Sequence, residues 1–189
     1  QLPHFRQLLL YSNACYQGQL YIVKYLVESG CITVDDVRRS EVDNHAVTIA
    51  CQNGHVQILR YLFETVGLTA DDIRGSYNCA LLMSCRNNHL KMVRYLFENV
   101  GLTASDARSE NCYALVWACR RNHLDVVKYL FERFGLTAAD ARRCHCLHWT
   151  CRNGHYNIVK YLFEHVGLTV DDARKYKCSL HQAYQNGHI

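Results

Sequence analysis

Apolar and polar positions follow a single pattern that recurs along the chain about every 34 residues. The copy at residues 122–140 reads NHLDVVKYLFERFGLTAAD. Other copies begin at Gln17, Asn53, Asn87 and Asn153, and the first residues of one more begin at Asn186. A repeated unit of this size predicts an array of stacked structural repeats, because one such unit is too small to bury its own apolar face.

Each copy contains a long amphipathic segment, as at residues 124–134. Its apolar side chains fall at helical spacing and make one wide face, formed by Val126, Val127, Leu130, Phe131 and Phe134. Charged side chains between them, such as Asp125 and Lys128, can then point to solvent. The pattern predicts an α-helix from Leu124 to Phe134 and at the equivalent positions of the other copies.

A shorter segment precedes each long one, as at residues 113–120, which read YALVWACR. Small residues and leucine share one of its faces, a pattern that favours a closely packed short helix. Between the two predicted helices lies a Gly-His or Asn-His pair, and glycine and asparagine adopt the left-handed backbone conformation most readily. Two helices joined by about three residues must be antiparallel neighbours.

The segment after each long helix also repeats, and we refer to it as the finger. It begins with a cap glycine and continues as Leu-Thr-x-x-Asp, for example Gly135, Thr137 and Asp140. A threonine followed three residues later by an acid is typical of a capping box, so each finger is predicted to hold a short helical turn. An arginine two residues further on, such as Arg142, completes an Asp-x-Arg row. This row could be a partner surface or a set of ion pairs between repeats.

These patterns predict an all-α fold, a solenoid of stacked antiparallel helix pairs with short helical turns in the fingers. No linker rich in Pro, Gly or Ser interrupts the chain, so we expect one array over residues 1–189. The expected units are residues 3–39, 44–75, 78–109, 111–143 and 144–175, with a truncated sixth unit at residues 177–189.

Composition limits the possible functions. The formal net charge of +4 is too small by itself to indicate binding to nucleic acid or to a membrane. No apolar run approaches the length that crosses a membrane, and the N-terminus lacks the basic head of a signal peptide. The missing initiator Met and the end within a repeat suggest a fragment of a longer chain. We expect the protein to be monomeric or part of a longer chain.

Eleven cysteines, an odd number, need an explanation. Five of them share one repeat position, and each follows a small residue: Cys15, Cys51, Cys85, Cys119 and Cys151. Such a column is typical of a buried packing residue, since a free cysteine behaves as a compact apolar side chain. We therefore expect reduced thiols and an intracellular, cytoplasmic location.

The short helix, the Gly-His turn, the longer helix and the glycine-led finger together resemble the ankyrin repeat family. The best matches begin at Tyr113 (YALVWACRRNHLDVVKYLFERFG) and at Cys146 (CLHWTCRNGHYNIVKYLFEHVG). Leu147 and His148 occupy the Leu-His position of the family's Thr-Pro-Leu-His motif, although the Thr-Pro is absent. The resemblance is to the divergent arrays of large DNA viruses and some protists, and it covers nearly the whole chain. It implies a stack of helix pairs that binds proteins through a concave face and the fingers.

Five candidate zinc ligands lie close together in the sequence at Cys144, His145, Cys146, His148 and Cys151. The repeat register gives several of them structural positions, since Cys151 belongs to the cysteine column and His148 to the Leu-His position. Zinc sites also usually draw their ligands from two separated segments. We therefore expect no metal and no cofactor, and a zinc-binding repeat is kept as an alternative.

Histidines follow the turns at His55, His89, His123, His155 and His188. A histidine there can satisfy backbone groups between the helices, and its repetition favours this role over titration or metal binding. Cysteine and histidine also lie four residues apart in several copies, as in Cys119 and His123. A catalytic site is normally built once and with a third orienting group, so we do not expect an enzyme.

A second basic column lies at the ends of the short helices, near aromatic residues. Protein interfaces favour arginine, tyrosine and tryptophan, so this column and the variable positions beside it form our candidate binding patch. The candidate residues are Tyr77, Arg86, Tyr113, Arg120, Arg121, His145, Arg152 and Tyr176. Trp117 and Trp149 lie nearby in the sequence and could belong either to the patch or to the core.

The sequence therefore predicts a module that binds a partner protein without catalysis. We expect specificity to come from the short segments that differ between the copies, such as residues 110–112 and 144–145. A structural spacer in a larger adaptor or enzyme is one alternative. A nucleic-acid-binding repeat that uses the arginine column is a weaker one, and membrane association is not expected.

Overall fold

The computed structural model describes residues 3–38, 46–74 and 78–175. These residues form helices and turns, and no strand occurs among them, so the predicted all-α fold is confirmed. They belong to two compact units, unit 1 within residues 1–102 and unit 2 within residues 103–189. In the described part of the chain, no helix combines the length and the apolar character that a membrane span requires.

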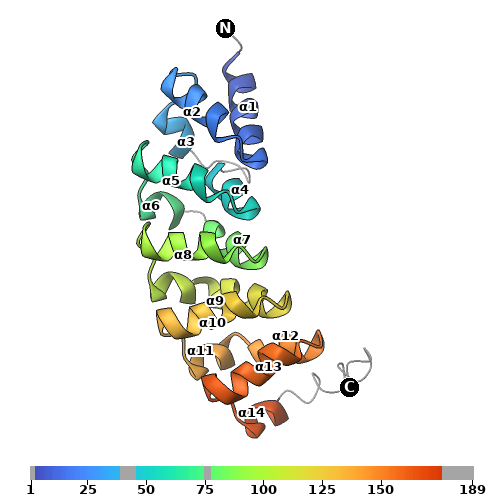
Figure 1. Ribbon diagram of the computed structural model, residues 1–189. Helices are drawn as coiled ribbons and strands as arrows, with labels where there is room; N and C mark the ends of the chain where they lie inside the picture. Colours follow the sequence, from blue (N-terminus) through green and yellow to red (C-terminus); the bar gives the residue numbers. More distant parts are fainter. Residues whose placement is uncertain (1–2, 39–45, 75–77, 176–189) are drawn as a thin grey trace. The chain divides into compact units, whose positions relative to one another are not determined.

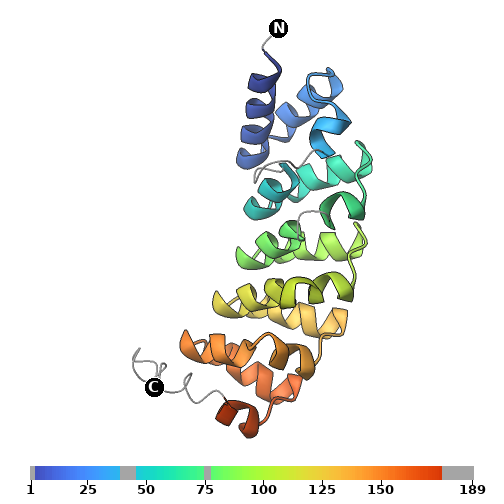
Figure 2. The same cartoon turned by 180° about the vertical axis from the view of Figure 1, so that it is seen from behind.

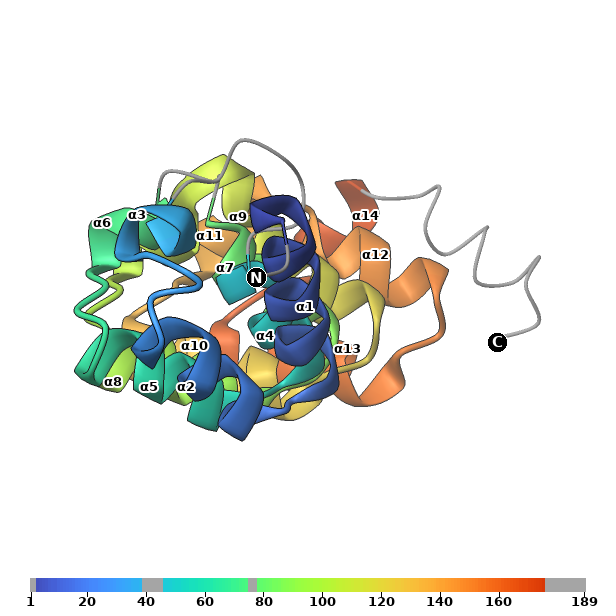
Figure 3. The same cartoon turned by 90° about the horizontal axis from the view of Figure 1, so that it is seen from above.

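Unit 1 consists of helix pairs, each followed by a finger (Figure 1). The first helices of the pairs are α1 (His4–Gln17), α4 (Ala46–Asn53) and α7 (Cys79–Arg86). The second helices are α2 (Leu20–Glu28), α5 (Val56–Glu64) and α8 (Leu90–Glu98), and the finger helices are α3 (Val34–Arg38) and α6 (Ala70–Arg74). First helices pack on first helices, and second helices on second helices. Seen from above, α2, α5 and α8 gather at one corner, and α3 and α6 at another (Figure 3).

Unit 2 has the same construction (Figure 2). Its helices are α9 (Ala104–Arg120), α10 (Leu124–Phe134), α11 (Ala138–Arg143), α12 (Cys146–Arg152), α13 (Tyr156–Tyr161), the π-helical turn η1 (Leu162–Val166) and α14 (Val170–Lys175). α10 has the bounds that the sequence predicts. α9 combines a finger helix with a first helix, because the backbone leaves the helical conformation at Ser109 and resumes it after Cys112. α9 packs on both α10 and α12.

The core lies between the first and second helices of each unit. Leu59 and Leu62 of α5 and Leu130 of α10 are fully buried, as the helical spacing of apolar residues predicts. Four members of the cysteine column are also completely inaccessible: Cys15, Cys51, Cys85 and Cys119. Cys151 is only half-buried, and it lies on α12, the last of the first helices that the structure describes.

The histidines after the turns connect successive repeats. His55 Nε2–H donates a hydrogen bond to the carbonyl oxygen of Tyr16 at 2.9 Å, and His89 Nε2–H donates to that of Gln52 at the same distance. The ring of His89 packs on Gly54, where an added Cβ would lie 2.7 Å from its Nδ1. Gly54 also has a positive φ of 75°, so this turn suits glycine for two reasons. The predicted structural role is confirmed for His55 and His89, while His188 lies outside the described residues.

The fingers contain the predicted capping boxes. In unit 2 the Thr137 amide and hydroxyl donate to Asp140 Oδ2 at 2.9 and 3.1 Å, immediately before α11. The amides of the equivalent threonines donate to the equivalent aspartates at 2.7–2.8 Å, in the pairs Thr33–Asp36, Thr69–Asp72, Thr103–Asp106 and Thr169–Asp172. Each finger therefore starts its helix with a carboxylate that satisfies otherwise unpaired backbone N–H groups.

Candidate functional site

Arg120 is the centre of an aromatic and basic group on the first helices of unit 2. Its guanidinium carbon lies 4.5 Å from the centre of the Trp117 ring on α9 and 4.4 Å from that of Trp149 on α12. Arg121 lies 5.7 Å from the Trp117 ring, and Arg152 lies 5.9 Å from the Trp149 ring. We call these five residues the Arg–Trp cluster. Each of these distances is within the range of an attractive cation–π contact.

The cluster is partly accessible to solvent. Trp117, Trp149 and Arg120 are half-buried, while Arg121 and Arg152 are exposed. The sequence left open whether the tryptophans belong to the core or to a surface patch. In the structure both tryptophans are only half-buried, and partly accessible tryptophans are common among the residues that dominate protein interfaces.

The backbone that carries Arg120 is fixed by the next repeat. His155 Nε2–H donates to the carbonyl oxygen of Arg120 at 2.9 Å, and the Asn153 side-chain amide donates to the same oxygen at 3.4 Å. These bonds pair a carbonyl group at the end of α9 that would otherwise lack a helical partner. The repeated turn thus positions the arginine that lies between the two tryptophans.

Arg120 and Arg121 differ from the finger arginines in their partners. Among the residues that the structure describes, neither Arg120 nor Arg121 forms an ion pair. The finger arginines behave differently, since Arg108 pairs with Asp140 at 3.1 Å and Arg142 pairs with Asp172 at 2.8 Å. Arg120 and Arg121 therefore carry positive charge beside the tryptophan rings, without an acidic partner among the described residues.

Two histidines lie beside the cluster. His148 makes an edge contact with Trp149, with ring centres 5.0 Å apart. Burial, followed by the positive charges of Arg152 and His145, lowers the pKa of His148 below its ordinary value. His145 is exposed and precedes α12 with a positive φ of 54°. His148 therefore has a greater tendency to be neutral at a given pH than a free histidine.

The structure brings together only part of the predicted patch. Arg120, Arg121 and Arg152 meet in the cluster, and His145 adds to the charge around its neighbour His148. Tyr113 is 51% exposed at the start of the helical part of α9 that carries the cluster. Of the three remaining candidates, Arg86 is half-buried on α7 of unit 1, and Tyr77 and Tyr176 lie outside the described residues.

The sequence left Trp117 and Trp149 open between the patch and the core, and it did not indicate that His148 would lie beside them. The available signal was their spacing, because Trp117 and Trp149 each stand three residues before an arginine of the basic column. Three residues correspond to nearly one helical turn, which puts each ring beside that arginine on the same face.

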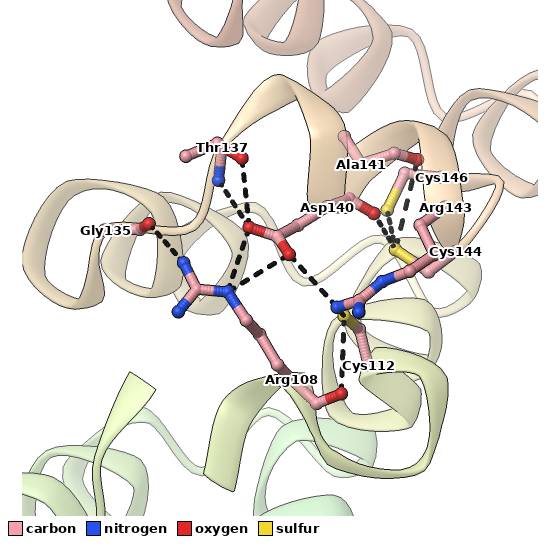
Figure 4. A network of polar contacts seen from close by, with 9 residues as sticks. All are labelled: Arg108, Cys112, Gly135, Thr137, Asp140, Ala141, Arg143, Cys144 and Cys146. Atoms are coloured by element: carbon pink, nitrogen blue, oxygen red, sulfur yellow. Dashed lines mark hydrogen bonds and ion pairs between the residues drawn. The ribbon is translucent and has the colours of Figure 1, made fainter. Parts of the chain in front are cut away.

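In the finger row, Arg38, Arg108 and Arg142 each form an ion pair with the capping aspartate of the next finger, as Figure 4 shows for Arg108. Arg108 Nε donates to both carboxylate oxygens of Asp140 at 3.1 and 3.2 Å, and its Nη2 donates to the Gly135 carbonyl at 2.8 Å. Burial raises the pKa of Asp140, but the bonds from the Thr137 amide and from Arg108 outweigh it, so the net pKa is lowered. Of the two interpretations of this row, the structure supports inter-repeat ion pairs.

The cysteines near α11 donate hydrogen bonds and pack against one another. Cys144 Sγ–H donates to the Asp140 carbonyl at 2.8 Å, and Cys144 Sγ lies 3.3 Å from Cys146 Sγ. A hydrogen bond with Cys112 lowers the pKa of Cys144, but hydrogen bonding with Cys146 and burial outweigh it, so the net pKa is raised. Among residues 3–38, 46–74 and 78–175, no group of three or more His, Cys, Asp or Glu side chains has the geometry of a metal site.

The Cys-His pairs that follow the first helices do not resemble a nucleophile and its base. Cys51 is completely buried, and this burial raises its pKa to about 12. His55, four residues later, donates its Nε2–H to the Tyr16 carbonyl. Cys51 is thus a packing residue of the core, and His55 satisfies a backbone carbonyl group at the turn, as their repeat positions predict.

Comparison with known families gives three matches. A model of ankyrin repeats (many copies) matches residues 11–63, a model of ankyrin repeats (3 copies) matches residues 66–140, and a model of a single ankyrin repeat matches residues 142–172. No curated protein matches the chain. The matched residues cover most of the sequence and coincide with the helix pairs described above. The chain belongs to the ankyrin repeat family.

Proposed function

We propose that this protein is a non-catalytic interaction module that binds a partner protein through the first-helix face of unit 2, with the Arg–Trp cluster as the main contact. Ankyrin repeats are generally protein–protein interaction modules, which supports the class of function. Tyr113 and His145 then flank the contact, while Arg86, Tyr77 and Tyr176 remain predicted contacts. An intracellular location fits the free thiols of the described cysteines.

One observation carries this proposal: Arg120 is held between two half-buried tryptophans without a counter-charge among the described residues. The chain pairs its finger arginines with acids but leaves this one unpaired. Tryptophan and arginine are the residue types that most often dominate the binding energy of protein interfaces. Holding them in one place before binding also lowers the entropy cost of forming a complex.

The test starts with affinity capture from a cell extract using the whole chain as bait. A captured partner is identified by mass spectrometry and purified, and its affinity is measured by calorimetry. The R120E/R152E variant is expected to bind at least about tenfold more weakly, which corresponds to about 1.4 kcal/mol.

The matched control is R133E/K91E, which changes the net charge equally but at exposed positions of the second helices α10 and α8. It should bind within about twofold of the parent chain, and circular dichroism should show the same helix content in both variants. Equal affinity of R120E/R152E and the parent would contradict the proposed surface. A bait that captures no specific partner would favour the structural spacer.

A further inference from the structure

We propose that the Arg–Trp cluster recognises an acidic peptide segment, a run of Asp or Glu residues that lies across α9 and α12. This inference rests on the proposed function and specifies the chemistry of the partner. It follows from the charges of the first helices, from the positions of the acids in unit 2, and from the way in which the tryptophan faces are occupied.

The first helices of unit 2 and their turns carry cations and no acid. Residues 113–122 contain Arg120 and Arg121, residues 146–154 contain Arg152 and His148, and neither segment contains Asp or Glu. An exposed cluster of like charges raises the free energy of the isolated protein through self-repulsion. A ligand with carboxylates removes this repulsion when it binds.

The Asp and Glu residues of unit 2 lie outside residues 113–122 and 146–154. The capping aspartates Asp106, Asp140 and Asp172 are buried at the finger helices. Asp125, Glu132 and Glu164 belong to the second helices and η1, Asp171 belongs to α14, and Glu110 precedes the helical segment that carries the cluster. None of these acids lies in the two segments that carry the Arg–Trp cluster, residues 113–122 and 146–154.

The arginines over the faces of Trp117 and Trp149 favour a carboxylate ligand over a stacked nucleic-acid base. A single-stranded nucleic acid binds largely by placing its bases on open aromatic faces. Here Arg120 lies over both Trp117 and Trp149, and Arg121 and Arg152 approach the same two rings. The guanidinium groups thus occupy the surface on which bases would stack.

A stacked guanidinium remains an effective donor to carboxylates. Its N–H groups lie in the plane of the group, so a contact between its face and an aromatic ring leaves them directed outward at the edge. A carboxylate can accept two parallel N–H bonds from such an edge, which is among the strongest polar contacts in proteins. Arg120 offers this edge near the centre of the cluster, and the exposed Arg121 and Arg152 extend it to neighbouring carboxylates of the same segment.

The test uses a fluorescein-labelled peptide of alternating Asp and Ser, about twelve residues long, so that it can cross both first helices when extended. The comparison ligands are the same peptide with Asn in place of Asp and an oligouridylate of equal charge. Binding to the whole chain is followed by fluorescence anisotropy. We expect the acidic peptide to bind at least about tenfold more tightly than the Asn peptide, and to weaken as NaCl rises.

The R120Q/R152Q variant should reduce the affinity for the acidic peptide at least about tenfold, whereas R133Q/K91Q should reduce it less than about twofold. Equal binding of the Asp and Asn peptides, no binding of either, or equal effects of the two variants would overturn the acidic ligand. Tighter binding of the oligouridylate would also overturn it, in favour of nucleic acid. If a captured partner depends on Arg120 and Arg152 but the acidic peptide does not bind, the proposed function holds and only the partner chemistry is wrong.

Discussion

Cysteine serves in this protein as a small packing residue. The fully buried thiols lie on the first helices, where a larger side chain would not fit between stacked repeats. Burial raises the pKa of Cys15 and of Cys51 to about 12. A pKa in this range leaves almost no thiolate near neutral pH, and the thiolate is the reactive form.

We therefore expect Cys15 and Cys51 to resist alkylation in the folded protein. At pH 8 the thiolate fraction of each is on the order of a thousandfold below that of a free cysteine. The measurement is iodoacetamide labelling followed by peptide mapping, in buffer and in guanidinium chloride. The half-buried Cys31 provides a reference thiol within the same protein. Labelling of Cys51 in buffer at its unfolded rate would contradict this expectation.

At the scale of the element, the finger helices are short and depend on their caps. An isolated helix of five or six residues is unstable in water, because nucleation costs more than so few hydrogen bonds return. The capping carboxylate satisfies N–H groups at the start of the helix, and the arginine of the preceding finger holds the same carboxylate. In unit 2 Asp140 also accepts a hydrogen bond from Arg143 Nη2 at 3.1 Å.

The D140N variant tests this dependence. The amide weakens the bonds to Thr137 and leaves Arg108 without its ion pair, so we expect a loss of about 1–2 kcal/mol in the free energy of unfolding. D71N is the control, because Asp71 belongs to the same kind of helix but its side chain is 87% exposed and pairs only with Arg74. Its effect should stay within about 0.5 kcal/mol. Urea denaturation followed by circular dichroism measures the free energy of unfolding of both variants. Equal losses in D140N and D71N would show that the capping contacts of Asp140 do not stabilise the fold.

At the scale of the whole molecule, the capping aspartates couple stability to pH in both units. The pKa values of Asp36, Asp140 and Asp172 are all lowered. For Asp172 the main cause is hydrogen bonding from Arg142, followed by that from the Thr169 amide. A carboxyl group with a lowered pKa in the folded state stabilises the fold above its unfolded pKa, about 3.9 for aspartate, and loses this contribution as pH falls through the folded value.

We accordingly expect the free energy of unfolding to fall as the pH decreases below about 4–5. The D140N/D172N variant should be less stable at pH 7 but should lose less stability between pH 6 and pH 3, because two of the groups that bind protons on unfolding are gone. Urea midpoints across this pH range provide the measurement. A variant curve parallel to that of the parent would be inconsistent with protonation of these two caps.

Local sequence determined the elements because their causes are local. The α10 helix follows from the spacing of Val126, Val127 and Leu130 along one face, and the start of α11 follows from Thr137 and Asp140 three residues apart. The number and boundaries of the repeat units remain a prediction. The break in α9 was not predictable, because Glu110, Asn111 and Cys112 adopt positive φ values that their residue types only occasionally take.

The sequence by itself determined that the chain is an all-α repeat array, and which residues occupy turns, caps and core. Only the tertiary structure decided which polar residues meet. Arg120 lies between tryptophans 32 residues apart, and Arg143 Nη2 reaches Cys112 Sγ at 3.1 Å. Such contacts depend on the register and spacing with which one repeat stacks on the next, whereas sequence periodicity reports only which face of a helix a residue occupies.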